Sequence, residues 1–153
     1  MMAAIRGKDT KPEMMVRRFL HANGYRFRLH RKDLPGKPDI VLPRLKTCIF
    51  VHGCFWHRHA GCRYAVLPKT RSEFWAAKLQ GNVERDRRSA EALAAAGWNV
   101  FVIWECGLRG SDAALLELLH ALQMLPSAGR VSPEVRDHRD IPSSTSSTSV
   151  TQE

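Results

Sequence analysis

The stretch that decides the fold reads Pro38-Asp-Ile-Val-Leu-Pro-Arg-Leu-Lys-Thr-Cys-Ile-Phe-Val-His52. Two apolar runs are separated by a short connection, which is the pattern of neighbouring strands in an antiparallel hairpin. A turn centred on residues 44–45 puts Asp39 opposite Phe50 and beside Val51, and a slip of one residue would shift every pair. The acidic residue that opens one strand and the histidine that closes the next therefore meet at one edge of the sheet.

The residues before the hairpin predict a helix and a strand. Thr10-Lys-Pro-Glu13 is typical of a helix start, and the helix is expected to cover about residues 11–23 because Gly24 can end it. From Tyr25 to His30, apolar and basic residues alternate, which indicates a half-exposed strand.

The residues after the hairpin predict a helix, a strand and a final helix. The capping box Thr70-Arg-Ser-Glu73 opens a helix that is interrupted near Gly81-Asn82 and stops at Gly97. A strand from Trp98 to Trp104 follows, and both tryptophans are assigned to the core. Ser111 or Asp112 caps a last helix, whose apolar side carries Leu115, Leu116, Leu118, Leu119 and Leu122. The order of helix, three strands, helix, strand and helix predicts an α/β fold with a mixed sheet.

Length and composition favour one domain that binds a polyanion. The 153 residues, 44% of them hydrophobic, suit a single core, which we place in residues 1–126. Residues 127–153 are rich in Ser, Thr and Pro and are predicted to be a disordered tail. The formal charge of +9 favours nucleic acid as a partner. No signal peptide or membrane-length apolar run is seen, so we expect a cytoplasmic protein without membrane contact.

The loop after the hairpin contains cysteine and histidine residues, which commonly bind metal ions. It reads His52-Gly-Cys-Phe-Trp-His-Arg-His-Ala-Gly-Cys62. Cys54, His59 and Cys62 have C-x4-H-x2-C spacing, and Cys106 at a strand end is the candidate fourth ligand of a structural zinc site. His57 is the rival histidine ligand. The fourth cysteine of the chain, Cys48, lies inside an apolar run and is interpreted as a small buried hydrophobe.

A second metal position is suggested by Asp39 at the hairpin edge. A carboxylate with a backbone carbonyl near Val51 offers the oxygen ligands that Mg²⁺ prefers. The alternative is that Asp39, which follows a proline, only stabilises a turn.

Several motifs together resemble the very short patch repair (Vsr) mismatch endonucleases, a branch of the PD-(D/E)xK nuclease superfamily. The resemblance runs from about Ile5 to about Gly110. It rests on Pro38-Asp39, Cys48–His52, Gly53–His57, Glu73–Trp75, Asn82–Arg88 and Trp104–Gly110. It implies a restriction-endonuclease-like αβββαβ core with a mixed sheet and a structural zinc site. It also implies a bacterial enzyme that acts at the nucleoid as a monomer, with repair-pathway partners.

The resemblance also implies an activity and a role for each site residue. Members nick the T-containing strand of duplex DNA 5′ of the thymine in T·G mismatches that arise from 5-methylcytosine deamination. Asp39 and the carbonyl of Val51 would bind Mg²⁺, His52 and Asp86 would pair in the outer metal shell, Glu13 would bind metal-bound water, and His57 would transfer protons. Cys54, His59, Cys62 and Cys106 match the zinc ligands, and Phe55, Trp56 and Trp75 would wedge into the base stack.

This chain departs from the family pattern at three places. Valine occupies position 51, where the family usually has threonine, but a carbonyl ligand does not depend on the side chain. The interval from His59 to Cys62 is one residue longer than the family pattern, and only nine residues precede Thr10, where the family has a minor-groove arm.

Two other functions remain open on the sequence alone. One is a zinc-stabilised DNA-binding module without catalysis, and the other is a nuclease of the same superfamily with a different substrate. Trp75 also has a structural interpretation, as a core aromatic at the start of a helix.

Overall fold

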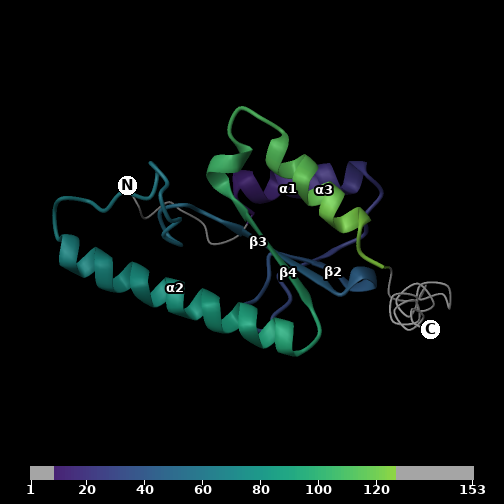
Figure 1. The fold of residues 1–153 in the computed structure, drawn as a ribbon, viewed down its shortest axis with the longest axis horizontal. Helices are drawn as coiled ribbons and strands as arrows, with labels where there is room; N and C mark the ends of the chain where they lie inside the picture. The colour runs from purple at the N-terminus through teal and green to yellow at the C-terminus, as the bar shows by residue number, and fades with distance from the viewer. Residues whose placement is uncertain (1–8, 127–153) are drawn as a thin grey trace, which may run out of the picture.

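The computed structural model describes residues 9–126 of the chain, and these residues form a sheet with helices on both faces (Figure 1). The α-helices are α1 (Lys11–Ala22), α2 (Ser72–Ala95) and α3 (Ala113–Gln123). The strands are β1 (Arg28–Leu29), β2 (Ile40–Leu42), β3 (Thr47–His52) and β4 (Asn99–Trp104), and short 3₁₀ turns cover Pro43–Leu45 and Glu105–Leu108. The predicted order of elements and the mixed α/β class are confirmed.

The hairpin of β2 and β3 has the predicted register. The four-stranded sheet has the order β1-β2-β3-β4, with antiparallel pairs except for the parallel pair of β3 and β4. Ile40 pairs with Ile49 and Leu42 with Thr47, so the alignment extends to place Asp39 opposite Phe50. The 3₁₀ turn closes this hairpin at Lys46, which adopts a left-handed conformation with φ of 49°.

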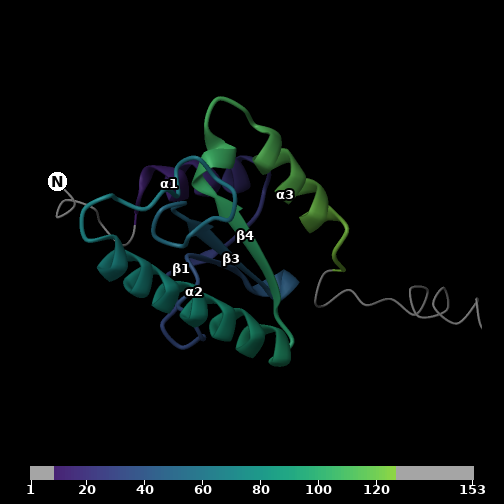
Figure 2. The same ribbon diagram turned by 60° about the vertical axis from the view of Figure 1, so that its left-hand side comes forward.

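Alternation along the strands creates a core on each face of the sheet. On one face Ile40, Leu42 and Ile49 pack with buried residues of α1 and α3. On the other face Val41 and Cys48 pack with Leu93 of α2. Figure 2 shows α2 lying across the face opposite to α1 and α3. His52 shares the alternation of Cys48, so it ends β3 on the face that α2 covers.

The first helix begins as predicted, whereas the first strand is shorter than predicted. Thr10 caps α1, because its hydroxyl accepts from the Glu13 N–H. Gly24 follows the helix with φ of 85°, a conformation that glycine adopts without a Cβ penalty. Only Arg28–Leu29 pair in β1, since β2 offers a short edge, but Tyr25 and Phe27 pack against the core as their alternation predicts.

Two predictions about the second helix, α2, are wrong. It runs without interruption from Ser72 to Ala95, because the backbone bonds of the helix continue through Gly81, which is exposed and needs no packing partner. The capping box at Thr70 does not form: the cap residue is Arg71 in a left-handed conformation, without a side-chain cap. Helix α2 is therefore held in place by its contacts with the sheet and the loops.

Gly36 provides one of these contacts. Its φ is 76°, and a Cβ at this position would lie 2.7 Å from Cβ of Ser89 in α2. The turn before β2 thus approaches α2 at a distance that only glycine permits.

In α3, the predicted apolar side is narrower than expected. Leu115, Leu118 and Leu122 are buried, but Leu116 is 56% exposed, because it lies on the opposite side of the helix. No helix in residues 9–126 is long and apolar enough to cross a membrane. The N-terminal arm and the tail predicted for residues 127–153 lie outside the described residues.

Candidate functional site

Asp39 lies at the hairpin edge, where its carboxylate contacts the neighbouring strand. Oδ2 of Asp39 accepts a hydrogen bond of 2.8 Å from the N–H of Val51. Burial raises the pKa of Asp39 to about 6, and the nearby Glu13 carboxylate adds to the rise, whereas the Val51 bond opposes it. A desolvated carboxylate with one oxygen held in place is suited to accept a divalent cation, which would compensate the buried charge. A role in turn chemistry alone does not explain this burial.

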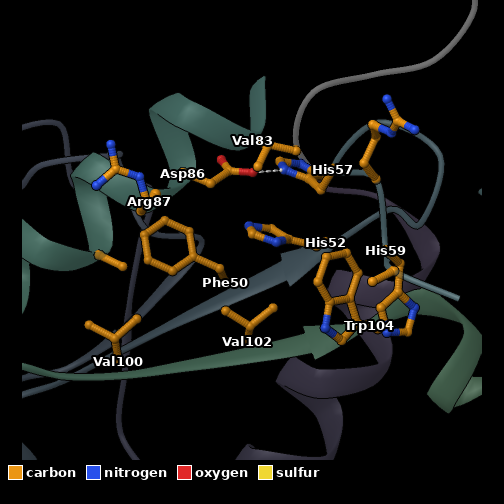
Figure 3. A pocket seen from close by; sticks show the side chains of 13 residues that line it. Phe50, His52, His57, His59, Val83, Asp86, Arg87, Val100, Val102 and Trp104 are labelled. Atoms are coloured by element: carbon orange, nitrogen blue, oxygen red, sulfur yellow. Dashed lines mark hydrogen bonds and ion pairs between the residues drawn. The ribbon is translucent and has the colours of Figure 1, made fainter. Parts of the chain in front are cut away.

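His57 pairs with Asp86 across the gap between the loop and α2. Nδ1 of His57 lies 2.6 Å from Oδ2 of Asp86, and both side chains are about one-third exposed or less (Figure 3). The carboxylate holds Nδ1 and thereby orients the ring, which leaves Nε2 as the nitrogen that can exchange a proton with a substrate. The prediction that His57 performs acid–base chemistry therefore has a suitable geometry.

His52 does not form the predicted pair with Asp86. Its ring instead stacks on His57, with centroids 3.7 Å apart and planes 2° from parallel, and its buried Nδ1 has no hydrogen-bond partner within residues 9–126. Burial and the neighbouring His57 lower the pKa of His52 to about 4, so its ring is neutral near pH 7. Asp86 forms its hydrogen bond with His57 because the loop places the His57 ring between β3 and α2.

A cavity of about 390 Å³ lies beside these histidines, between α2 and the sheet. Figure 3 shows His57 and Asp86 above His52 and Phe50, with Val100 and Val102 below them, and all six line the cavity. His52, His57 and Asp86 also form a group that can hold a metal ion.

The four predicted zinc ligands lie together. The ligand atoms of Cys54, His59, Cys62 and Cys106 are all within 4.8 Å of one another. Sγ of Cys106 lies 3.4 Å from Nδ1 of His59, and the Cys106 N–H donates to Sγ of Cys54 over 3.4 Å. The structure places His59, and not its rival His57, in this group.

The chemistry of this group fits zinc. Three sulfurs and one imidazole nitrogen are a usual set for a closed tetrahedral site, whose zinc–sulfur bonds measure about 2.3 Å. Burial raises the pKa of Cys54 to about 12, so a cation is required to stabilise its thiolate at neutral pH. Cys48 lies apart from the group, fully buried in the core, as predicted.

Trp104 connects the cysteine group to the histidine pair and is not a core residue. Its ring stacks on His59 with centroids 4.1 Å apart, and it meets His52 edge-on at 5.2 Å. It also lines the cavity in Figure 3. The prediction that Trp104 belongs to the core is wrong, because it ends β4 where the sheet meets the loop. Trp98 does pack against the core.

The predicted wedge residues Phe55, Trp56 and Trp75 form one aromatic cluster. Their ring centroids lie 5.1 to 5.9 Å apart in edge-on contacts. All three are partly exposed, so Trp75 is not a fully buried core residue. Asn82 anchors the cluster to α2, because its Nδ2 donates to the carbonyl oxygen of Trp56 over 3.0 Å. Asn82 and Asp86 are one helical turn apart, so one face of α2 holds both the aromatic and the histidine parts of the loop.

Glu13 lies near Asp39, in a network of charged groups. It is 2% exposed, and its Oε1 accepts from Arg17 over 2.9 Å and from the Asp9 N–H over 3.0 Å. A buried carboxylate held by these donors is fixed in place, which suits an acceptor for ordered water.

Comparison with known sequences shows related proteins over most of the chain. The family described as DNA mismatch endonuclease Vsr matches residues 1–63. The chain is 56% identical over 117 residues to Type II nicking enzyme V.XorIIP of Xanthomonas oryzae, a match that covers 76% of this chain and 84% of that protein. It is 45% identical over 122 residues to DNA mismatch endonuclease Vsr of Escherichia coli, covering 77% and 78%.

The chain belongs to the Vsr family. It is therefore a DNA endonuclease of the mismatch-nicking type, and the resemblance seen in the sequence is confirmed. This Vsr-family chain also resembles Type II nicking enzyme V.NmeAIP of Neisseria meningitidis, with 45% identity over 108 residues, covering 71% and 76%.

Some site residues of this Vsr-family chain were missed by sequence reasoning. Phe74 is 46% exposed, contacts Trp75 edge-on at 5.3 Å, and lies under the Arg71 guanidinium. Its position beside Trp75 was the available signal. Arg17 was also missed, although its i,i+4 spacing from Glu13 in the predicted helix was an available signal; its contact with His30 depends on the tertiary structure.

The arginines in the middle of α2 differ in whether acidic neighbours compensate their charges. Arg87 in α2 is paired with Glu84 and Glu91 of the same helix, so part of its charge is compensated. Arg85 and Arg88 on the same helix are exposed and form no ion pair within residues 9–126. These two are better placed than Arg87 to contact phosphate.

Proposed function

We propose that this Vsr-family chain is a Mg²⁺-dependent endonuclease that nicks the T-containing strand 5′ of the thymine in a T·G mismatch arising from 5-methylcytosine deamination. The observation that carries the proposal is the meeting of three groups at one edge of the sheet. These are the buried carboxylate of Asp39, the His57–Asp86 pair, and the aromatic cluster of Phe55, Trp56 and Trp75.

Asp39 and the carbonyl of Val51 would hold the catalytic cation in this proposal. Such a cation would polarise the scissile phosphate and stabilise charge that develops on the leaving oxygen. Asp39 is fixed for this role by the Val51 N–H. Glu13, which is also fixed, would orient a water molecule bound to the cation.

His57 would exchange the proton. Its Nδ1 is held by Asp86, so Nε2 can give a proton to the leaving 3′ oxygen or take one from the attacking water. His52 supports the ring of His57 from below through the stacking contact. Because the pKa of His52 is lowered, its ring adds no positive charge beside His57 near pH 7.

The aromatic cluster would select the mismatch by deforming the duplex. Inserting side chains between base pairs costs a few kcal/mol of unstacking for each step, and a wobble pair should be cheaper to deform than a matched pair. The three rings already contact one another in the free protein. They would therefore enter the base stack with little further loss of side-chain entropy.

A structural zinc ion at Cys54, His59, Cys62 and Cys106 would keep the loop in position. The loop carries both His57 and the rings of Phe55 and Trp56, so zinc would link catalysis to mismatch binding. We also propose that the helices and mixed sheet are a restriction-endonuclease-like αβββαβ core, which acts as a monomer on duplex DNA. The order of the elements supports this assignment.

Nicking of labelled duplexes tests this function. Duplexes that differ only in a central T·G, C·G or T·A pair, labelled on either strand, are incubated with and without Mg²⁺, with Asp39→Asn as the control. We expect one Mg²⁺-dependent nick, on the T-containing strand of the T·G duplex. Equal cutting of all duplexes would favour a nuclease with another substrate, and binding without cutting in Mg²⁺ or Mn²⁺ would favour a DNA-binding module.

A further inference from the structure

One guanidinium nitrogen lies at the centre of three potential metal ligands. Nη2 of Arg17 is 2.8 Å from Oδ1 of Asp9, 2.9 Å from Oε1 of Glu13 and 3.0 Å from Nε2 of His30. The same three side chains form a group whose ligand atoms all lie within 4.8 Å of one another. The nitrogen of Arg17 thus occupies the place that a cation would take in this group.

Burial makes the charge of Arg17 important to the group. The Arg17 side chain is 10% exposed and that of Glu13 is 3% exposed. An ionised carboxylate that is buried this deeply needs a compensating charge or it destabilises the fold by several kcal/mol. The Arg17 guanidinium supplies this compensation from within the chain, so it does not depend on metal concentration.

His30 links the group to Asp39. Its backbone adopts a left-handed conformation with φ of 48°, and its N–H donates to the carbonyl oxygen of Asp39 over 3.3 Å. A histidine in this conformation is uncommon and costs energy, so other contacts must hold it there. Arginine has only donors, so Nε2 of His30 accepts from Arg17, and this bond aims the ring at the group.

The two oxygens of Glu13 are used differently. Oε1 receives both strong bonds, from Arg17 and from the Asp9 N–H. Among the described residues, Oε2 accepts only a weak hydrogen bond of 3.4 Å from the Thr10 hydroxyl. One oxygen is therefore anchored and the other keeps acceptor capacity, which is the arrangement expected of a carboxylate that orients water.

We propose that Arg17 is a built-in cation that takes the place of a metal ion in the group of Asp9, Glu13 and His30 and is a positioning residue for Glu13. Arg17 holds the Glu13 carboxylate in place near Asp39 and keeps divalent ions out of the group of Asp9, Glu13 and His30. The part that concerns Glu13 rests on the proposed function, whereas the exclusion of metal does not.

Counting bound Mn²⁺ tests the exclusion without any reaction. Arg17→Ala is compared with Arg18→Ala, a matched control because Arg18 is the next residue of the same helix and is exposed. The free Mn²⁺ signal in electron paramagnetic resonance gives the number of ions bound for each chain in the absence of DNA. We expect one more ion in Arg17→Ala than in Arg18→Ala, and loss of that extra ion in the double variant Arg17→Ala, His30→Ala. Equal numbers in the two single variants would overturn the proposal.

A second variant tests the proposal if Arg17→Ala does not fold. Arg17→Lys keeps the positive charge but replaces the planar guanidinium, whose Nη2 contacts all three partners, with a flexible ammonium group. It should bind no extra Mn²⁺, yet it should need more Mg²⁺ for half-maximal nicking, by about tenfold or more if Arg17 positions Glu13 as strongly as other outer-shell groups do. DNA affinity should stay near that of Arg18→Lys. An unchanged Mg²⁺ requirement would overturn the positioning role.

The two readouts separate failure of this inference from failure of the proposed function. If the natural protein does not nick mismatched DNA, the Mn²⁺ count still decides whether Arg17 excludes metal. If it does nick, while Arg17→Ala and Arg18→Ala bind the same number of ions and nick alike, Arg17 has no such role and the proposed function stands.

Discussion

Nδ1 of His57 lies 2.6 Å from Oδ2 of Asp86, although 29 positions of sequence separate the two residues. The contact joins the loop after β3 to the middle of α2, and His52 stacks beneath it. Because Asp86 uses the Nδ1 side, the remaining nitrogen of His57 is the one available to a phosphodiester. This pairing gives the loop and the helix a shared part in the proposed reaction.

Replacing His57 should slow nicking without removing zinc. In His57→Ala we expect the single-turnover rate to fall by roughly 10²-fold or more, as for loss of a general acid or base. Asp86→Asn keeps the shape of the side chain but not its charge, so its single-turnover rate should fall by a smaller factor. Rapid-quench measurement with a labelled T·G duplex gives both rates. A His57→Ala variant with the natural rate would remove His57 from the mechanism.

Asp39→Asn should abolish nicking and stabilise the metal-free protein. The folded-state pKa of Asp39 is about 6, above the ordinary value of 3.8, so the folded protein binds the proton more tightly than the unfolded chain. Stability therefore decreases as pH rises from about 4 to about 6, and the deficit persists at pH 7, on the order of 1–3 kcal/mol at most.

Urea unfolding at pH 4 and pH 7 in the presence of a Mg²⁺ chelator measures this effect. Asn at position 39 cannot ionise but can still accept from the Val51 N–H, so Asp39→Asn should gain more stability at pH 7 than at pH 4. DNA affinity should be unchanged or higher, because one repulsion with phosphate is lost. An equal effect at both pH values would show that burial of Asp39 does not strain the fold.

Removal of a single cysteine of the zinc group should release the metal. Cys106→Ser and His59→Ala should both lose zinc and lower the unfolding temperature, since a structural site contributes folding free energy directly. Cys48→Ala is the matched control, because Cys48 is buried in the core and apart from the group. Elemental analysis of the purified proteins decides the point. Zinc retained in Cys106→Ser, or absent from the natural protein, would contradict the four-ligand site.

Truncation of Trp56 should reduce mismatch selectivity more than DNA affinity. Its ring belongs to the cluster with Phe55 and Trp75, whereas most affinity should come from salt-sensitive phosphate contacts. In Trp56→Ala the ratio of nicking rates on T·G and C·G duplexes should fall. Leu116→Ala controls for loss of an exposed apolar side chain on a different helix. If Trp56→Ala weakens binding to both duplexes alike and leaves the ratio intact, the ring binds DNA without selecting the mismatch.

Much of the fold followed from local patterns. The hairpin register, which places Asp39 opposite Phe50, depends only on a short connection and period-two alternation. The start of α1 at Thr10 likewise depends on a few adjacent residues. The two wrong predictions for α2 also came from local patterns. Gly81 predicted a break and the motif at Thr70 predicted a cap, but packing along the whole helix outweighs the effect of one glycine or one cap.

The sequence by itself indicated which side chains can supply the proposed chemistry: Asp39 at a strand start, the Cys and His residues with zinc-type spacing, and the aromatic residues beside them. Only the tertiary structure decided how they pair. Asp86 binds His57 instead of His52, Trp104 lies between His59 and His52 instead of in the core, and Arg17 occupies the centre of Asp9, Glu13 and His30. Residue type and spacing limit which atoms can interact, but the partner of each is set by ring orientation and by the position of helices, which depend on contacts between segments far apart in the chain.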